Sequence, residues 1–191
     1  MKKIIIAIDS FKGCLTSAEA GKAAEKGIKS INPFCHTSVI PIADGGEGLL
    51  DVLITATKGK YITLSAHGPL MKMTKTHYGL SGNGRTAIIE MAAISGLPLV
   101  PIEQRNPMLT TTFGTGELIK DALNKGCRNF IIGIGGSATN DAGLGMLQAL
   151  GFRFLDKSGH TLGTGGQIME AVANIDTSGI HPALRETHFM V

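Results

Sequence analysis

The chain has 191 residues, of which 43% are hydrophobic and 17% are charged. This length is ample for one ordinary domain and short for two, and the composition excludes a disordered chain. The net charge is only +3, with Lys and Arg scattered along the chain, so we expect no nucleic-acid partner.

The first half of the chain predicts alternating strands and helices. An Ile-rich run at residues 3–8 predicts a strand buried on both faces, as in parallel sheets. Thr16 and Glu19 have capping-box spacing and predict a helix over residues 17–31. A second strand and a second helix are expected at residues 37–42 and 48–57.

The pattern then changes to β-rich segments. Gly-Pro and Gly-Asn-Gly signals within residues 60–85 predict antiparallel hairpins. The run TAIIEMAAISGL is ambiguous between strand and helix, and we interpret it as a strand that leads into a short helix around Met91. A helix is then expected at residues 113–124 and a strand at residues 129–134. A further helix at residues 139–150 and a strand at residues 152–155 would complete a second β-α-β passage.

Processing and compartment signals are few. Cys14, Cys35 and Cys127 are far apart and lack CxxC spacing, so neither a disulfide framework nor a zinc site is indicated. The apolar run at the N-terminus stops at Asp9, too early for a signal-peptide core or a membrane span. We therefore expect a cytoplasmic protein with no membrane partner, and the sequence leaves its oligomeric state open, a homo-oligomer included.

The most informative motif is FIIGIGGSATND, residues 130–141. An apolar strand that breaks into paired glycines and small polar residues predicts a tight turn at the start of a helix, where backbone N–H groups favour an anion. Gly135 and Gly136 would let a ligand approach the backbone, and Ser137, Thr139 and Asn140 would add donors. The alternative is a plain turn in which one small polar residue caps the helix.

The same segment also fits a dinucleotide fingerprint. Gly133, Gly135 and Ala138 match GxGxxA, and Asp156 follows at the end of the next expected strand. An ionised Asp141 at the helix start would repel a bare pyrophosphate, so a metal-nucleotide complex suits this loop better. A nicotinamide-dependent oxidoreductase stays open as an alternative.

Three other loops carry candidate ligand chemistry. ADGGEG, residues 43–48, places Asp44 and Glu47 among glycines, which suits a hard cation or a substrate hydroxyl, or else a solvated turn. In DSFKG, Lys12 follows the first strand, where open α/β sheets place ligands. FGTGELI puts Thr115 at a helix start, either as a ligand contact or as part of an ordinary helix terminus. Neither GxxxxGK[ST] nor GxSxG is present.

Four ordered segments together resemble the glycerate kinase family, the bacterial type without a P-loop. They are DSFKGCLTS (residues 9–17), PIADGGEG (41–48), RNPMLTTTFGTGELI (105–119) and GIGGSATNDAGLGMLQALG (133–151). Cys14 stands where that family usually has serine, and Ala142 where it usually has glycine.

The resemblance implies an α/β fold, with a Rossmann-like parallel-sheet domain at residues 1–66 and part of a second α/β domain at residues 67–191. It also implies magnesium-dependent transfer of the ATP γ-phosphoryl group to a hydroxyl of D-glycerate, in a cleft between the domains. Family members are about twice this long, and the closing residues RETHFMV read as the beginning of a strand, so we expect an N-terminal portion with both domains incomplete.

Site residues follow from the resemblance by position. Lys12, Asp44 and Asp141 are the expected catalytic residues, and Asp44 and Glu47 the expected magnesium ligands. The expected substrate and nucleotide contacts are Asp9, Ser10, Gly45, Gly46, Thr115, Gly135, Gly136, Ser137 and Asn140. An acidic segment that helps to form the family's active site would lie beyond Val191, so an inactive fragment that only binds an acid or a nucleotide is a second hypothesis.

Overall fold

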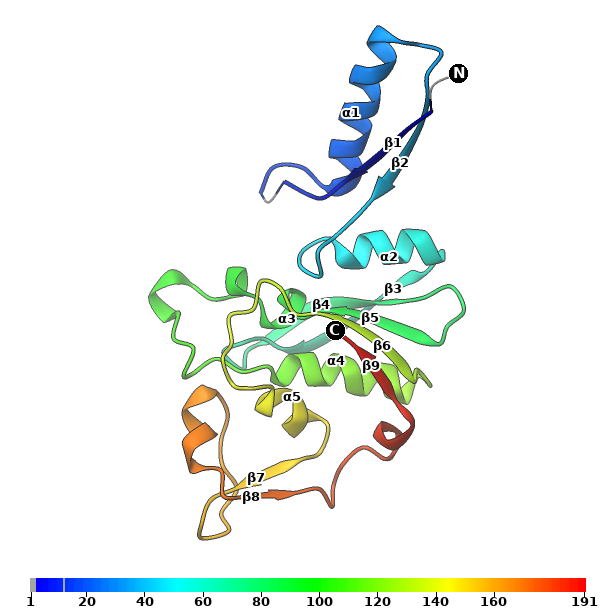
Figure 1. Ribbon diagram of the computed structural model, residues 1–191. Helices are drawn as coiled ribbons and strands as arrows, with labels where there is room; N and C mark the ends of the chain where they lie inside the picture. The colour runs from blue at the N-terminus through cyan, green and yellow to red at the C-terminus, as the bar shows by residue number, and fades with distance from the viewer. Residues whose placement is uncertain (1–2, 12) are drawn as a thin grey trace.

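The computed structural model of the chain describes residues 3–11 and 13–191 and has an α/β fold (Figure 1). A small N-terminal unit stands at one end, and a larger unit built around a five-stranded sheet follows it. Within the described residues, no helix is both long enough and apolar enough to cross a lipid bilayer.

The N-terminal unit is a β-α-β passage, as predicted, but its first strand is not buried on both faces, since Ile5 is exposed. It consists of β1 (Lys3–Ile8), α1 (Ser17–Ile31) and β2 (His36–Pro41), and the two strands pair in parallel from Lys3 opposite His36 to Ile8 opposite Pro41. The predicted capping box is present, since the Thr16 hydroxyl accepts the N–H of Glu19 and the Glu19 carboxylate accepts the N–H of Thr16. Gly21 brings α1 close to the sheet, because a Cβ there would collide with Val39.

The larger sheet has the strand order β3-β4-β5-β6-β9. Its strands are β3 (Lys60–His67), β4 (Met73–Leu80), β5 (Thr86–Glu90), β6 (Asn129–Gly133) and β9 (His188–Met190). The pairs β3-β4 and β4-β5 are antiparallel, whereas β5-β6 and β6-β9 are parallel. The predicted antiparallel hairpin is therefore confirmed, but this five-stranded sheet is mixed rather than purely parallel.

Helices cover both faces of this sheet (Figure 1). On one side α2 (Leu49–Thr57) packs through Leu50 and Ile54 against Ile88, and on the other α4 (Phe113–Asn124) packs against Ile89 and Phe130. Neighbouring residues of β5 thus serve opposite layers, as the two-residue period of a strand requires. The run TAIIEMAAISGL becomes β5 followed by the short helix α3 (Ala92–Ser95), as interpreted from the sequence.

The second predicted β-α-β passage is wrong beyond β6. The helix expected at residues 139–150 is only α5 (Leu144–Ala149), because the Asp141 carboxylate accepts the N–H groups of Gly143 and Gly145 and so competes with helical hydrogen bonds. The following strand β7 (Arg153–Leu155) pairs antiparallel with β8 (Asn174–Asp176) in a separate two-stranded sheet.

Short 3₁₀ helices complete the fold at Leu97–Leu99, Ile102–Gln104, Gly166–Ala171 and Pro182–Glu186. β3 already belongs to the five-stranded sheet, so the change of sheet falls between β2 and β3. The division into domains at residues 66 and 67 stays a prediction.

Candidate functional site

The two glycine-rich loops predicted to bind ligands lie in direct contact. The N–H of Gly135, after β6, donates to the carbonyl of Gly45, after β2, at 3.4 Å. A Cβ on Gly135 would lie 2.7 Å from the Cα of Gly46, and one on Gly133 would lie 2.5 Å from the Gly45 oxygen. Glycine is thus required at residues 133 and 135, because a side chain there would keep the two loops apart. The loop after β2 and the loop after β6 therefore lie directly against each other.

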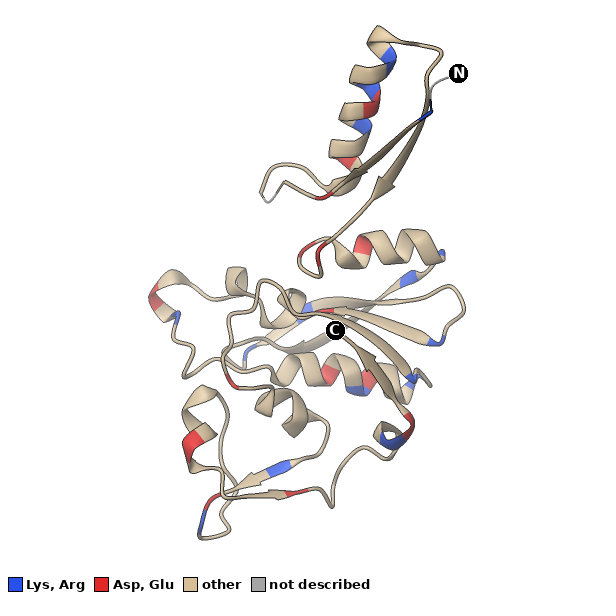
Figure 2. Ribbon diagram, in the orientation of Figure 1, with Lys and Arg blue, Asp and Glu red and all other residues tan. Residues whose placement is uncertain are grey.

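Two carboxylates lie in the first of these loops. Asp44 and Glu47 are both exposed, and Asp44 Oδ1 accepts the N–H of Gly46 at 3.1 Å, which fixes the turn. Gly48 then begins α2 with a φ of 94°, a left-handed conformation that favours glycine. Figure 2 shows acidic positions in this loop and on α2.

A third carboxylate, Glu90, approaches the same region from the end of β5. Its Oε1 accepts the N–H of Leu50 in the first turn of α2 at 2.7 Å. Burial raises the pKa of Glu90, and the backbone donors of Leu50 and Gly48 act in the opposite direction. Sequence reasoning missed Glu90, although a lone carboxylate at the carboxyl end of an apolar strand is a usable signal.

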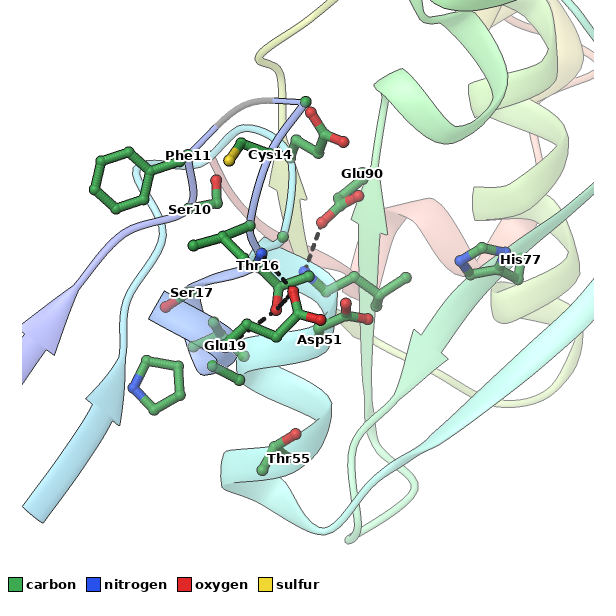
Figure 3. A pocket seen from close by; sticks show the side chains of 18 residues that line it. Ser10, Phe11, Cys14, Thr16, Ser17, Glu19, Asp51, Thr55, His77 and Glu90 are labelled. Atoms are coloured by element: carbon green, nitrogen blue, oxygen red, sulfur yellow. Dashed lines mark hydrogen bonds between the residues drawn. The ribbon is translucent and has the colours of Figure 1, made fainter. Parts of the chain in front are cut away.

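An acidic cavity of about 470 Å³ lies between the loop after β1, the starts of α1 and α2, the middle of β4 at His77 and the end of β5. Figure 3 shows the loop residues Ser10 and Cys14 opposite Asp51 and Glu90. The carboxylates that line this cavity are Glu19, Glu47, Asp51 and Glu90. Within the described residues no Lys or Arg lines it, so a polyanion would need cations for charge balance.

The predicted residues of the DSFKG loop lie beside this cavity in part. Asp9 Oδ1 accepts the N–H of Ser10 at 2.6 Å, and both residues are half-buried. Ser10 lines the cavity. Lys12, an expected catalytic residue, lies outside the described residues.

A smaller cavity of about 250 Å³ lies farther along the β6 loop. Its polar lining comes from Ser137 and Thr139 of that loop and from Arg105 and Asn106. Ser137 Oγ accepts the N–H of Thr139 at 3.0 Å and lies 2.8 Å from its hydroxyl. Gly136 and Asn140 in the same loop are exposed. Both sides of the loop therefore offer accessible polar groups.

Two of the expected site residues are buried instead. Asp141 is only 1% exposed, and its oxygens accept from backbone or hydroxyl groups of Thr111, Thr112, Gly143 and Gly145. Its carboxylate is thus fully engaged in joining the segment before α4 to the segment before α5. These hydrogen bonds give Asp141 a role in positioning the two segments, and its expected catalytic role stays a prediction.

Thr115 has no exposed surface, and its hydroxyl lies 2.9 Å from that of Ser95. Its neighbours Gly114 and Gly116 allow α4 to pack, since a Cβ on either would collide with the backbone of His67 or Met146. The FGTGELI motif therefore acts as a helix start and packing surface, and the ligand contact expected of Thr115 stays a prediction.

A magnesium ion fits the donors of the first loop. Within residues 3–11 and 13–191, no group of three or more His, Cys, Asp or Glu side chains is arranged to hold a metal. Magnesium, however, commonly binds proteins through one or two carboxylates together with substrate phosphates and water. Asp44 and Glu47 are two exposed carboxylates in one loop, and such a pair would suit a site of that kind.

The dinucleotide alternative loses its structural basis. A dinucleotide fingerprint needs its acidic residue at the end of a strand parallel to the first, whereas β7 pairs only with β8 among the described strands. Asp156 turns back on its own loop, where Oδ1 accepts the N–H groups of Ser158 and His160. The loop after β6 also does not lead directly into a helix.

The geometry is that of an α/β protein whose ligand loops gather at the carboxyl ends of strands from two sheets. A family model described as the glycerate kinase family matches residues 4–191. The chain belongs to the glycerate kinase family, as the resemblance predicted.

Curated relatives and a solved structure agree with this assignment. A glycerate kinase of Bacillus subtilis (strain 168) is 52% identical over 189 residues, which are 99% of this chain and 50% of that protein. A glycerate 2-kinase of Escherichia coli (strain K12) is 49% identical over 184 residues, 96% of this chain and 48% of that protein. A crystal structure from Salmonella typhimurium LT2, provisionally named glycerate kinase 2, has 47% identity and a TM-score of 0.87 over 98% of this chain and 50% of that one. The chain thus spans about half the length of these relatives.

Proposed function

We propose that this chain forms the N-terminal part of a glycerate kinase active site, which transfers the ATP γ-phosphoryl group to a hydroxyl of D-glycerate. The observation that carries this proposal is the contact between the two glycine loops. Because the Gly135 N–H donates to the Gly45 carbonyl, the loop that holds Asp44 and Glu47 lies against the loop that follows β6. Membership of the glycerate kinase family supplies the reaction class.

The residue types suit phosphoryl transfer, which depends on positioning and charge neutralisation more than on covalent chemistry by the protein. The N–H groups of Gly46 and Gly135 hold the two loops in place, and phosphate oxygens would meet the backbone at Gly45 and the exposed Gly136, where no side chain intervenes. In this proposal hydroxyl and amide donors come from Ser10, Ser137 and Asn140, while Asp9 orients the N–H of Ser10. Lys12 is kept as the cationic residue of the site on the basis of the family motif alone.

Asp44 and Glu47 would hold magnesium in this site. When bound, the ion would neutralise phosphate charge, which the carboxylates of the acidic cavity would otherwise oppose. Asp44 can fix its turn and still serve this task, because Oδ1 accepts the N–H of Gly46 and a carboxylate has a second oxygen.

A second candidate function is binding of an acid or a nucleotide without turnover. It is favoured by one observation, the coverage of only about half of each relative's length. Calorimetry with ATP and with D-glycerate separates the candidates when it is combined with an assay for ADP. Binding of either compound without ADP release supports the second.

The first test is ADP release that requires D-glycerate and magnesium together. In an active chain, Asp44→Asn is expected to lower kcat by about a hundredfold or more, because a charged ligand or base is removed. Glu170→Gln, an exposed carboxylate change in the 3₁₀ helix at Gly166–Ala171, serves as the control. Near-normal kcat in Asp44→Asn would make Asp44 a turn residue only.

A further inference from the structure

The two cavities differ in the charge of the side chains that line them. Within the described residues, the larger cavity is lined by four carboxylates and by no Lys or Arg. The smaller one is lined by Arg105 and by no carboxylate. A small carboxylate ligand would be repelled by the first set of side chains and attracted by the second.

Arg105 is held in place and has hydrogen-bonding capacity left. Its Nε donates to the carbonyl of Val100 at 3.3 Å, and in the described part of the chain it belongs to none of the ion pairs. The terminal nitrogens of a guanidinium form paired, parallel hydrogen bonds with a carboxylate. An arginine fixed through Nε is therefore suited to recognise an acid group.

The remaining lining is complementary to a small hydroxy acid. The Ser137 and Thr139 hydroxyls, 2.8 Å apart, supply polar partners on the β6 loop. Asn106 Oδ1 accepts the N–H of Met108 at 3.0 Å, which orients the amide whose nitrogen is a further donor. Leu97, Val100 and Pro107 add apolar walls. The volume of about 250 Å³ is below the usual range for drug-sized ligands and suits a smaller one.

We propose that this cavity binds the carboxylate of the small hydroxy-acid substrate, with Arg105 as its binding residue. The inference rests on the proposed function, because the acid group must lie near the phosphoryl-transfer loops. Ser137 is two residues from Gly135, a separation of at most about 7 Å along the chain. Ser137 lines the cavity with Arg105, so an acid held there would lie against the loop that also carries Gly135, and its hydroxyl carbons would be directed toward the junction of the two glycine loops. The cavity would also select an acid over a neutral polyol.

Amide NMR spectra of the 191-residue chain test this assignment. D-glycerate is expected to shift the amides of residues 105–106 and 137–139, while glycerol at the same concentration leaves them unchanged. Arg105→Met should raise the Kd for D-glycerate at least tenfold, and Arg105→Lys should raise it less. Arg85→Met is the control. Arg85 directly precedes β5 and does not line the small cavity, so this variant should bind D-glycerate as the unmodified chain does. The same spectra report whether each variant is folded.

Three outcomes would overturn the inference. Glycerate-induced shifts confined to residues 10–19 and 47–55, with Arg105→Met unaffected, would place the acid in the larger cavity. Loss of binding of a non-hydrolysable ATP analogue with magnesium, but not of D-glycerate, in Arg105→Met would assign the small cavity to the nucleotide. Absence of any glycerate response would also reject it. Glycerate-dependent ADP release is measured separately, so each failure can be told apart from failure of the proposed function.

Discussion

Asp141 shows how a residue in a ligand-like motif can serve the loops around it. Its carboxylate is buried and receives hydrogen bonds from both the segment before α4 and the segment before α5. Asp44, in a similar glycine-rich sequence, is exposed and satisfies one backbone group. The two aspartates differ through tertiary burial, which neither motif encodes locally.

Asp141→Asn is expected to destabilise the fold by about 2 kcal/mol, because an amide nitrogen would face N–H or hydroxyl donors and leave buried groups unpaired. Urea unfolding followed by circular dichroism measures the change in free energy of unfolding. Asp44→Asn is the matched control and should change it by less than about 1 kcal/mol. Equal losses in the two variants would contradict a structural role specific to Asp141.

The sequence predicted the positions of candidate residues well where a motif directly follows a strand. Both glycine loops were predicted to follow strands and do so, whereas their contact through Gly45 and Gly135 is a tertiary feature that the structure adds. Glu90 was missed because its run could be strand or helix, and only the strand places the carboxylate at the sheet edge. The burial of Thr115 was not foreseen, since it depends on α3, which supplies Ser95.

Among the elements, α1 was predicted most closely because its start is encoded locally. The capping box at Thr16 and Glu19 needs only residues three apart. The predicted start of α5 was too early, because the Asp141 carboxylate accepts hydrogen bonds from backbone N–H groups at the beginning of this segment. The pairing of β7 with β8 was also missed, since their contact joins residues about twenty positions apart along the chain.

Thr16→Ala is expected to lower the free energy of unfolding by about 1 kcal/mol through loss of the helix cap. Thr16→Ser keeps an acceptor at the same place and should stay close to the original stability. Urea titrations of the three proteins provide the measurement. A serine variant as unstable as the alanine variant would argue against capping as the cause.

The capping box also predicts an acid dependence. The backbone N–H and hydroxyl of Thr16 lower the pKa of Glu19 below its ordinary value of 4.5. A depressed carboxyl pKa gives stability that is present above pH 4.5 and is lost as the pH falls through the folded-state value. Glu19→Gln should lack this part of the acid sensitivity in unfolding curves from pH 7 to pH 3. Identical pH profiles for the two proteins would exclude it.

At the scale of the whole molecule, the two sheets differ in how well they are covered. The β1-β2 sheet has α1 on one face, while Ile5 and Ile40 on the strands remain exposed. The five-stranded sheet has α2 on one face and α4 on the other. A two-stranded sheet with one covered face is marginal in water, so stability is expected to concentrate in the larger unit.

Hydrogen exchange measured by mass spectrometry tests this difference. Amides of β1 and β2 are expected to exchange faster than those of β5, β6 and α4, because opening the small unit exposes less buried apolar surface. Among the slowest amides we expect those around Ile89, Leu118 and Phe130. Protection of β1 equal to that of β6 would show that the two units open together.

The cysteines differ in access in a way that has a practical consequence. Cys14 is exposed and lines the acidic cavity, whereas Cys35 and Cys127 are buried, and burial raises the pKa of the Cys127 thiol. Thiolates are the reactive form, so a maleimide dye should attach selectively at Cys14. The natural chain therefore carries its own attachment point for a fluorophore beside the cleft, and its emission would report ligand entry without any engineered label.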